Sequence, residues 1–372
     1  MSWHSCRLGD VLTLKRGHDL PEHSRQDGDV PVVSSSGITG RHTEAKATAP
    51  GVVTGRYGTI GEVFYLEEDY WPLNTALYVI DFKGNDPRFA SYFLRNILKG
   101  YQSEKAAVPG VDRNVLHEIK VRAPSHDLQL GIAGILSAYD DLIENNRRRM
   151  ALLEESARLL YREWFVRLRF PGYEHTPIVD GVPQGWEQKT LGDLCSEIRD
   201  MVLPEALESD TPYIGLEHIP RRSISLNEWG TVEEVTSSKS RFKAGEIIFG
   251  KIRPYFHKVG VAFVDGVASS DSIVVRPADD TLHGLVLMTM SSDEFVATTA
   301  QQMKEGSKMP RADWKQMKAY PVPLPPSGLL SNFDGVIQPI LKQLKSISFT
   351  NQKLRNARDL LLPRLMSGEL AV

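Results

Sequence analysis

The sequence predicts an α+β protein in which two β-rich globular domains are each followed by a long coiled-coil helix. Three observations predict this class. The second half of the chain repeats the first, each half ends in a heptad pattern, and the segments before those patterns are short β-branched or aromatic runs bounded by Gly, Pro or Asp. The chain has 372 residues, enough for two or more domains, and its 41% hydrophobic content is typical of a folded protein.

The repeat is clearest at the start of each half. "WHSCRLGDVLTLKRGHDLP" from Trp3 aligns without a gap with "WEQKTLGDLCSEIRDMVLP" from Trp186, and seven of the 19 positions are identical, Arg16 with Arg199 among them. Three further matches follow in the same order: "DVPVV" with "DTPYI", "PGVVTGRYG" with "AGEIIFGKI", and "VDRNVLHEIKVRAP" with "ADWKQMKAYPVPLP". Four matches in one order predict an internal duplication rather than chance similarity.

A heptad pattern follows each β-rich segment, with seam positions that alternate steps of four and three residues. Each helix is therefore expected to run about 40 residues, or roughly 60 Å. The seam residues of the first half are Ile132, Leu136, Tyr139, Ile143, Asn146, Met150, Leu153, Ala157, Leu160 and Trp164. Those of the second half are Phe333, Ile337, Ile340, Leu344, Ile347, Asn351, Leu354, Arg358, Leu361 and Leu365.

Polar residues and prolines interrupt these patterns. Each seam contains one asparagine, which either fixes register and partner number at a cost in stability or is a solvated polar break. Pro339 and Pro363 predict a kink in the second helix or, at Pro363, its fraying end. A Pro/Gly-rich stretch predicts a linker between the halves. The predicted parts are a first domain at 1–124, a first helix at 125–168, the linker at 169–185, a second domain at 186–326, and a second helix with the C-terminal tail at 327–372.

Composition excludes several classes of protein. The formal net charge is −3, so only local clusters of charge can argue for a nucleic-acid partner. Cys6 and Cys195 are far apart in sequence and predict neither a disulfide framework nor a zinc site, which fits a reducing compartment. No apolar run approaches the ~18 residues of a membrane span, and the N-terminus lacks the apolar core of a signal peptide. We therefore expect a cytoplasmic protein with no metal site and no membrane partner.

One stretch resembles a nucleotide-binding loop. In "AGEIIFGKIRPYFHK", the spacing of Gly245, Gly250 and Lys251 fits the start of the phosphate-loop pattern G-x-x-x-x-G-K-[ST]. The residues between the glycines, 246–249, favour a strand, and Ile252 cannot bind Mg²⁺ as the Ser or Thr of a true loop does. "GRYGTIG" favours a hairpin over a dinucleotide site, and "HEIKV" lacks the second histidine of a zinc protease. We expect no catalytic residue and no cofactor in this chain.

Positive charge near aromatic and hydroxyl side chains is the remaining chemical signal. Six Lys or Arg lie between Val235 and Lys258, and five lie between Lys304 and Lys318. Such clusters can neutralise DNA phosphates and read guanine edges, although each can also be a solvated basic face. In the first half, "SSSGITGRHT" offers small positions that suit a close phosphate approach. The DNA-binding candidates are Ser36, Arg41, Lys46, Arg56, Tyr57, Arg113, Asn114, Lys239, Arg241, Lys251, Arg253, Tyr255, Lys258, Lys308 and Arg311.

Over essentially its whole length the chain resembles the specificity subunit of type I restriction–modification enzymes. The resemblance rests on the W-x4-L-G-D start of each half, the strand "AGEIIFGKIRPY", the run "YPVPLPP" entering a long helix, and the ending "LRNARDLLLPRLMSGEL". The first half matches less closely, because "GRYGTIG" stands where a K-I-R-P-like sequence is expected and "VRAPS" replaces "PLPP". Its DNA contacts are correspondingly harder to place.

The resemblance implies a function and a set of partners. The two β-rich domains would be target-recognition domains that each bind half of a split site in double-stranded DNA, and the long helices would pack antiparallel with pseudo-two-fold symmetry and set the spacing. Two methyltransferase subunits would bring S-adenosylmethionine, and restriction or motor subunits would bring ATP and Mg. The Pro325–Pro326 pair lacks the flanking residues of a methyltransferase motif. Two alternatives stay open: a coiled-coil protein scaffold without DNA readout, and the recognition subunit of a simpler methyltransferase–nuclease without a motor.

Overall fold

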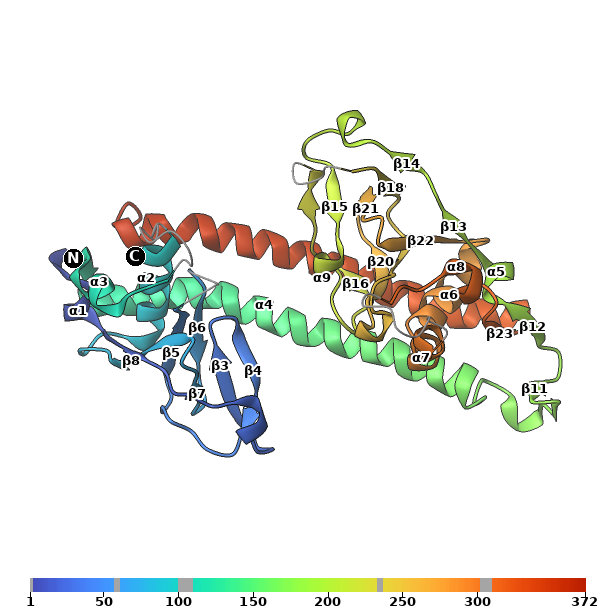
Figure 1. The fold of residues 1–372 in the computed structure, drawn as a ribbon, viewed down its shortest axis with the longest axis horizontal. Coiled ribbons are helices and arrows are strands. Elements are labelled where there is room, and N and C mark those ends of the chain that lie inside the picture. Colours follow the sequence, from blue (N-terminus) through green and yellow to red (C-terminus); the bar gives the residue numbers. More distant parts are fainter. Residues whose placement is uncertain (1–2, 57–60, 100–109, 233–236, 302–309) are drawn as a thin grey trace. The chain divides into compact units, whose positions relative to one another are not determined.

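The computed structural model describes residues 3–56, 61–99, 110–232, 237–301 and 310–372. Contacts divide the chain into two compact units (Figure 1): unit 1 comprises 1–144 and 353–372, and unit 2 comprises 145–352. Each unit therefore contains one β-rich domain and a part of both long helices. Among the described residues, none of the helices combines the length and apolar composition needed to cross a bilayer.

Unit 1 contains two sheets beside helix α2 (Pro87–Lys99). One sheet has the strand order β2 (Thr13–Arg16), β8 (Ala76–Asp81), β5 (Gly51–Gly55) and β6 (Val63–Leu66), and the other has the order β4 (Gly37–His42), β3 (Val30–Ser34) and β7 (Trp71–Pro72). A separate antiparallel pair joins β1 (Trp3–Arg7) to β9 (Lys120–Pro124), which brings the two ends of the β-rich segment together.

Unit 2 has the same plan with extra strands. Its first sheet has the order β13 (Cys195–Ile198), β22 (Ser272–Pro277), β19 (Ile247–Gly250), β20 (Val259–Ala262) and β16 (Ser225–Leu226). Its second has the order β14 (Met201–Val202), β18 (Lys239–Phe242), β21 (Gly266–Ala268), β15 (Pro212–Ile214) and β17 (Gly230–Thr231). The pair β12 (Glu187–Thr190) and β23 (Pro321–Leu324) corresponds to the pair β1 and β9, and helices α6 (His283–Met290) and α7 (Asp293–Gln301) follow β22. The stretch predicted as a linker contains a short hairpin of β10 (Ile178–Val179) and β11 (Val182–Pro183).

The four sequence matches become the same elements in both units, so the predicted internal repeat is confirmed. The L-G-D motif forms the short helices α1 (Leu8–Val11) and α5 (Leu191–Leu194), "DVPVV" and "DTPYI" form β3 and β15, and the third match forms β5 and β19. The fourth match forms α3 (Arg113–Glu118) and α8 (Trp314–Met317), which are capped by Asp112 and Asp313.

The glycine of L-G-D lies where two segments approach closely, so that a side chain there would push its neighbour aside. A Cβ atom added to Gly9 would lie 3.1 Å from Cβ of His117, and one added to Gly192 would lie 3.1 Å from Cβ of Lys318. The N–H of Gly192 also donates to the carbonyl of Lys318 at 2.8 Å. The duplicated glycine therefore holds the start of each domain against its last helix, so that the β-rich segment closes on itself.

The long helices are α4 (His126–Tyr161), which continues into a π-helical turn over Arg162–Val166, and α9 (Ser327–Ser367). Helix α9 runs without interruption through Pro339 and Pro363, so the helix does not end at Pro363 as one of the two expectations held. All seam residues predicted from the heptads are buried or half-buried.

The helices run in opposite directions within each unit. In unit 2 the Nδ2 of Asn146 donates to the Oδ1 of Asn351 at 2.8 Å. In the π-helical turn that follows α4, the ring centroid of Phe165 lies 4.8 Å from that of Phe333.

In unit 1 the guanidinium of Arg358 binds the carboxylate of Asp140, while Ile132 shares a buried cluster with Leu365. Both parts of the helix pair therefore place later residues of α4 against earlier residues of α9.

The asparagine pair generates a prediction about stability. Replacing Asn351 with Leu leaves the half-buried amide of Asn146 without its partner, which we expect to lower the free energy of unfolding of unit 2 by about 1–3 kcal/mol. Replacing both residues with Leu should recover most of that loss, because no polar group then stays unpaired. Denaturant titration of the three proteins measures the effect. An Asn351→Leu protein as stable as the wild type would mean that the asparagines are a solvated break.

Candidate nucleic-acid interface

The strand prediction for the phosphate-loop-like stretch is correct, because Ile247–Gly250 form the buried strand β19. The next residue, Lys251, is held by its backbone on both sides. Its N–H donates to the carbonyl of Asp271 at 2.7 Å, and its carbonyl accepts from the N–H of Ala312 at 2.9 Å. Its ammonium donates to the carbonyl of Ser270 at 3.2 Å. This geometry fixes a cation at the end of a central strand and forms no phosphate loop.

Unit 1 contains the same arrangement at the end of β5. The N–H of Arg56 donates to the carbonyl of Thr75 at 2.9 Å, and its carbonyl accepts from the N–H of Val111 at 2.9 Å. Arg56 therefore occupies the position that Lys251 occupies in unit 2. An alignment of Gly55–Arg56 with the Gly–Lys step of the second half would have revealed this equivalence in the sequence.

A second cation lies at the same sheet edge in each unit. Strands β2 and β5 are both antiparallel to β8, so they end at one edge, and β13 and β19 are related to β22 in the same way. Arg16 is the exposed last residue of β2, and the exposed Arg199 directly follows β13, where it pairs with Glu197 at 2.7 Å. The identity of these two arginines was visible in the sequence, but neither was among the DNA-binding candidates.

The loop after Lys251 has a defined shape. Ile252 forms an isolated antiparallel bridge with Arg311, and the N–H of Arg253 donates to the carbonyl of Pro310 at 2.9 Å. Arg253 and His257 both have left-handed backbones, with φ of 50° and 53°. They flank the 3-10 helix η7 (Pro254–Phe256). Left-handed residues other than glycine cost roughly 1 kcal/mol or more each and cluster at functional sites.

The side chains of this loop form an exposed aromatic and cationic group. Tyr255 is 53% exposed, and its ring centroid lies 5.0 Å from that of Phe256. The guanidiniums of Arg221 and Arg253 lie 4.0 and 5.8 Å from the centroid of the Phe256 ring, within the range of cation–π attraction. Arg221 was not a sequence candidate, because it lies outside the two basic clusters. The structure thus brings the candidates Lys251, Arg253, Tyr255 and Arg311 together and adds Arg221.

Other candidates of unit 2 lie elsewhere. Lys239 is buried in β18, where its ammonium donates to the hydroxyl of Ser237 at 2.7 Å. Lys258 is half-buried, its ammonium donates to the carbonyl of Leu216, and burial lowers the pKa of this ammonium below its ordinary value. Arg241 is exposed on β18, in the sheet that does not contain β19. The structure therefore uses Lys239 and Lys258 for internal hydrogen bonds.

The candidates of unit 1 are more dispersed. Ser36 is exposed in the turn between β3 and β4, and the guanidinium of Arg41 donates to the backbone carbonyl of Asp29. The ammonium of Lys46 lies 4.9 Å from the centroid of the Trp71 ring.

Arg113 and Asn114 are exposed at the start of α3, close in sequence to Val111, whose N–H binds the carbonyl of Arg56. Tyr57 and Lys308 lie outside the described residues.

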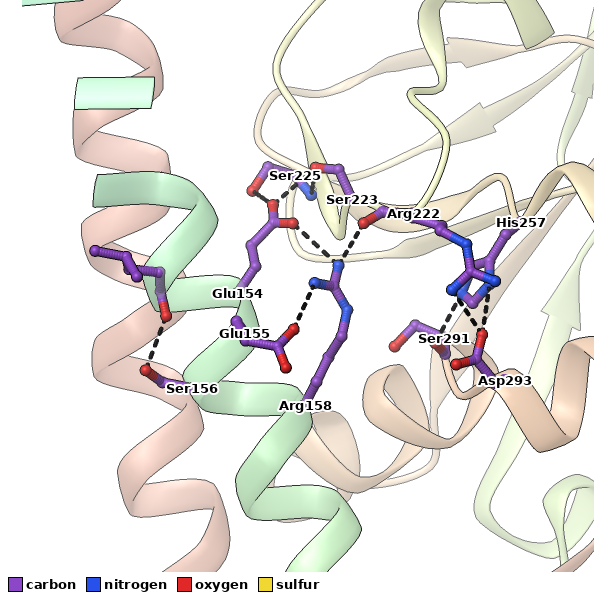
Figure 2. A network of polar contacts seen from close by, with 11 residues as sticks. Glu154, Glu155, Ser156, Arg158, Arg222, Ser223, Ser225, His257, Ser291 and Asp293 are labelled. Atoms are coloured by element: carbon purple, nitrogen blue, oxygen red, sulfur yellow. Dashed lines mark hydrogen bonds and ion pairs between the residues drawn. The ribbon is translucent and has the colours of Figure 1, made fainter. Parts of the chain in front are cut away.

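A polar pocket in unit 2 lies between the end of α4 and the start of α7. Its lining includes Arg158, Arg222, His257 and Asp293 (Figure 2). His257 is buried, and its Nε2 donates to the carbonyl of Ser291 at 2.8 Å. Among the described residues, no group of three or more His, Cys, Asp or Glu side chains is arranged to hold a metal ion.

The chain is similar to known proteins over most of its length. The family model for the type I restriction modification DNA specificity domain matches residues 2–155 and 183–357. The chain is 24% identical over 306 residues to the type I restriction enzyme MjaIX specificity subunit of Methanocaldococcus jannaschii, covering 76% of this chain and 66% of that protein. It is 22% identical over 353 residues to the EcoDI specificity subunit of Escherichia coli, covering 88% of this chain and 78% of that protein.

A solved type I restriction–modification S subunit from M. genitalium has a similar fold, with a TM-score of 0.60 and 16% identity over 98% of this chain and 96% of that one. The chain therefore belongs to the family of type I restriction–modification specificity subunits, whose general role is recognition of a DNA target. The predicted family is confirmed. The match to the Methanocaldococcus jannaschii relative spans 66% of that protein's length, just under two thirds.

The pocket generates a prediction about pH. Burial is the main cause that lowers the pKa of His257 below its ordinary value of 6.5, and the nearby Arg222 and Arg158 act in the same direction. The hydrogen bond to the carbonyl of Ser291 and the carboxylate of Asp293 oppose this shift without cancelling it. A lowered pKa in the folded state means that the stabilisation is present above about pH 6.5 and is lost as the pH falls, because protons then favour the unfolded chain. His257→Gln, whose amide can still donate to Ser291, should lose less thermal stability than the wild type between about pH 7.5 and about pH 5.5. Equal losses in a thermal unfolding assay would contradict this expectation.

Proposed function

We propose that the chain is the sequence-specific DNA recognition subunit of a type I restriction–modification complex and that its two units each read one half of a bipartite site. One observation carries the proposal: the same sheet edge in both units holds a cation at the end of its central strand, Arg56 in one and Lys251 in the other. A duplicated protein with a duplicated cationic edge suits a duplex whose backbone has approximate two-fold symmetry.

The residues at this sheet edge fall into two groups: those that are identical in the two units and those that differ. Arg16 and Arg199 are identical and equivalently placed, so they suit the phosphate backbone, which is the same at both half-sites. The sequence that follows Lys251, which includes Arg253 and Tyr255, differs from the sequence "YGTIG" that follows Arg56, so these two residues suit the bases, which differ between half-sites. Arginine can bind guanine through two hydrogen bonds in the major groove.

We further propose that this chain is non-catalytic and takes its chemistry from partners. In this proposal two methyltransferase subunits bring S-adenosylmethionine, and restriction or motor subunits bring ATP and Mg. The family membership supports these partners, and the sequence supports the division of labour because it offers no complete catalytic motif. The long helices, which contribute to both units, suit a scaffold for such subunits.

The central test is to map the modified bases. Co-expression with the methyltransferase subunit should produce adenine methylation at a split motif with a fixed gap. Exchanging residues 1–124 for those of a relative should change one half of the motif only, because the β-rich domain of unit 2 keeps its own sequence. Changes in both halves of the motif would contradict the proposal that each unit reads one half-site. Contacts with DNA phosphates release counterions, so the affinity of a DNA-recognition complex should fall as the salt concentration rises. An affinity that does not change with salt would favour a protein scaffold without DNA readout.

The division between backbone and base contacts gives a sharper prediction. Arg199→Ala should weaken binding to cognate and unrelated duplexes alike and reduce the slope of log affinity against log salt by about one. Arg253→Ala should cost about 1–3 kcal/mol at its cognate half-site and relax the motif there. Arg169→Ala, which removes an exposed arginine after α4, is the matched control and should change neither property. Fluorescence anisotropy with purified full-length variants measures both effects, and reversed phenotypes for Arg199 and Arg253 would refute the assignment.

A further inference from the structure

Helix α4 contains a buried carboxylate that none of the proposed DNA contacts uses. The side chain of Glu154 is 6% exposed, although this residue lies on a helix with several exposed charges. Its Oε1 accepts hydrogen bonds from the hydroxyls of Ser223 at 2.7 Å and Ser225 at 2.6 Å, and its Oε2 accepts from the guanidinium of Arg158 at 3.1 Å (Figure 2). A buried carboxylate is stable only with such partners, so this helix position is matched to one segment, 222–225.

The segment that Glu154 binds contacts the loop after Lys251, which carries the proposed DNA contacts Arg253 and Tyr255. The N–H of Arg222 donates to the carbonyl of His257 at 2.9 Å, and its guanidinium pairs with Asp293 at 2.8 Å. The preceding residue, Arg221, lies with its guanidinium over the ring of Phe256. Arg158 adds a further connection, since it donates to the backbone carbonyl of Arg222. Figure 2 shows this chain of contacts from α4 through the segment to Asp293 and His257.

We propose that Glu154 is a positioning residue for DNA readout by unit 2. It holds segment 222–225 on α4, and this segment in turn fixes the turn that carries Arg253, Tyr255 and Phe256. The proposal rests on the proposed function, because it assumes that this turn contacts DNA. The proposed role of Glu154 includes no contact with DNA. Glu154 determines how the loop after Lys251 is oriented relative to helix α4.

Unit 1 uses different chemistry at its own helix contact. There Asp140 accepts from the hydroxyl of Tyr92 at 2.6 Å and binds the guanidinium of Arg358. A change at Glu154 therefore leaves the contacts of Asp140 intact, and the half-site read by unit 1 serves as an internal control. This asymmetry separates a positioning role from general loss of stability, which would weaken both half-sites.

The experiment compares Glu154→Ala, Glu154→Gln and Glu155→Ala in the full chain co-expressed with its methyltransferase subunit. Glu155 is the matched control, because it is the neighbouring carboxylate, is exposed and contacts Arg158 at 3.7 Å. Glu154→Ala should reduce discrimination at the half-site of unit 2 by about tenfold or more and leave the other half-site unchanged. Glu154→Gln keeps an acceptor for the two serines and should lose less, while Glu155→Ala should match the wild type.

The readouts are the methylation motif and the affinity for duplexes altered in one half-site. Equal losses at both half-sites, or no loss in Glu154→Ala, would overturn the proposal. If Glu154→Ala does not fold, Ser225→Ala removes one of the hydroxyl donors and carries the same half-site-specific expectation. A wild-type complex without a split motif would instead refute the proposed function, so the two failures are distinguishable.

Discussion

The antiparallel contact between α4 and α9 is the interaction on which both units depend, because each β-rich domain is completed by a helix from the other half of the sequence. Leu362, Leu365 and Met366 of α9 belong to the buried cluster of the first domain. Tyr161 and Phe165, at the end of α4 and in the turn that follows it, belong to the cluster of the second. The two repeats are therefore interleaved, and neither half of the sequence supplies a whole core. This explains why the boundary between the units falls within the helices and not at the linker.

Much of this fold follows from local patterns in the sequence. The repeat was predictable from identity between the two halves, the strand at 247–250 from its β-branched and aromatic residues, and the two long helices from their heptad periodicity. The boundary between the units was not, since the heptad pattern is uniform through Glu144 and Asn145 and does not reveal which β-rich domain a given turn contacts. The sequence shows one asparagine in each seam, but only the structure shows that the two asparagines form a hydrogen bond with each other.

The candidate site was less predictable, because charge in a sequence does not reveal exposure. Lys239 and Arg241 are two residues apart on one strand, yet the first is buried and the second is exposed. Arg221 and Glu154 escaped notice because their roles depend on neighbours distant in sequence, Phe256 for the arginine and two serines for the glutamate. Long-range contacts of this kind have no local signature, whereas the equivalence of Arg56 and Lys251 was present in the sequence and needed only a better alignment.

The left-handed residues at the two ends of the η7 turn have a consequence for the thermodynamics of the DNA binding that we propose for this turn. The backbone is tied at Arg253 by Pro310 and at His257 by Arg222, so the turn has few conformations left before any ligand arrives. Ordering a flexible loop would oppose association through lost conformational entropy, and a turn that is already ordered avoids most of this cost. Because the backbone hydrogen bonds hold the turn, an exposed side chain within it, such as that of Tyr255, can be replaced without altering the path of the backbone. Under the proposed function, new base preferences can therefore arise by substitution of side chains on this turn, with no change in its backbone.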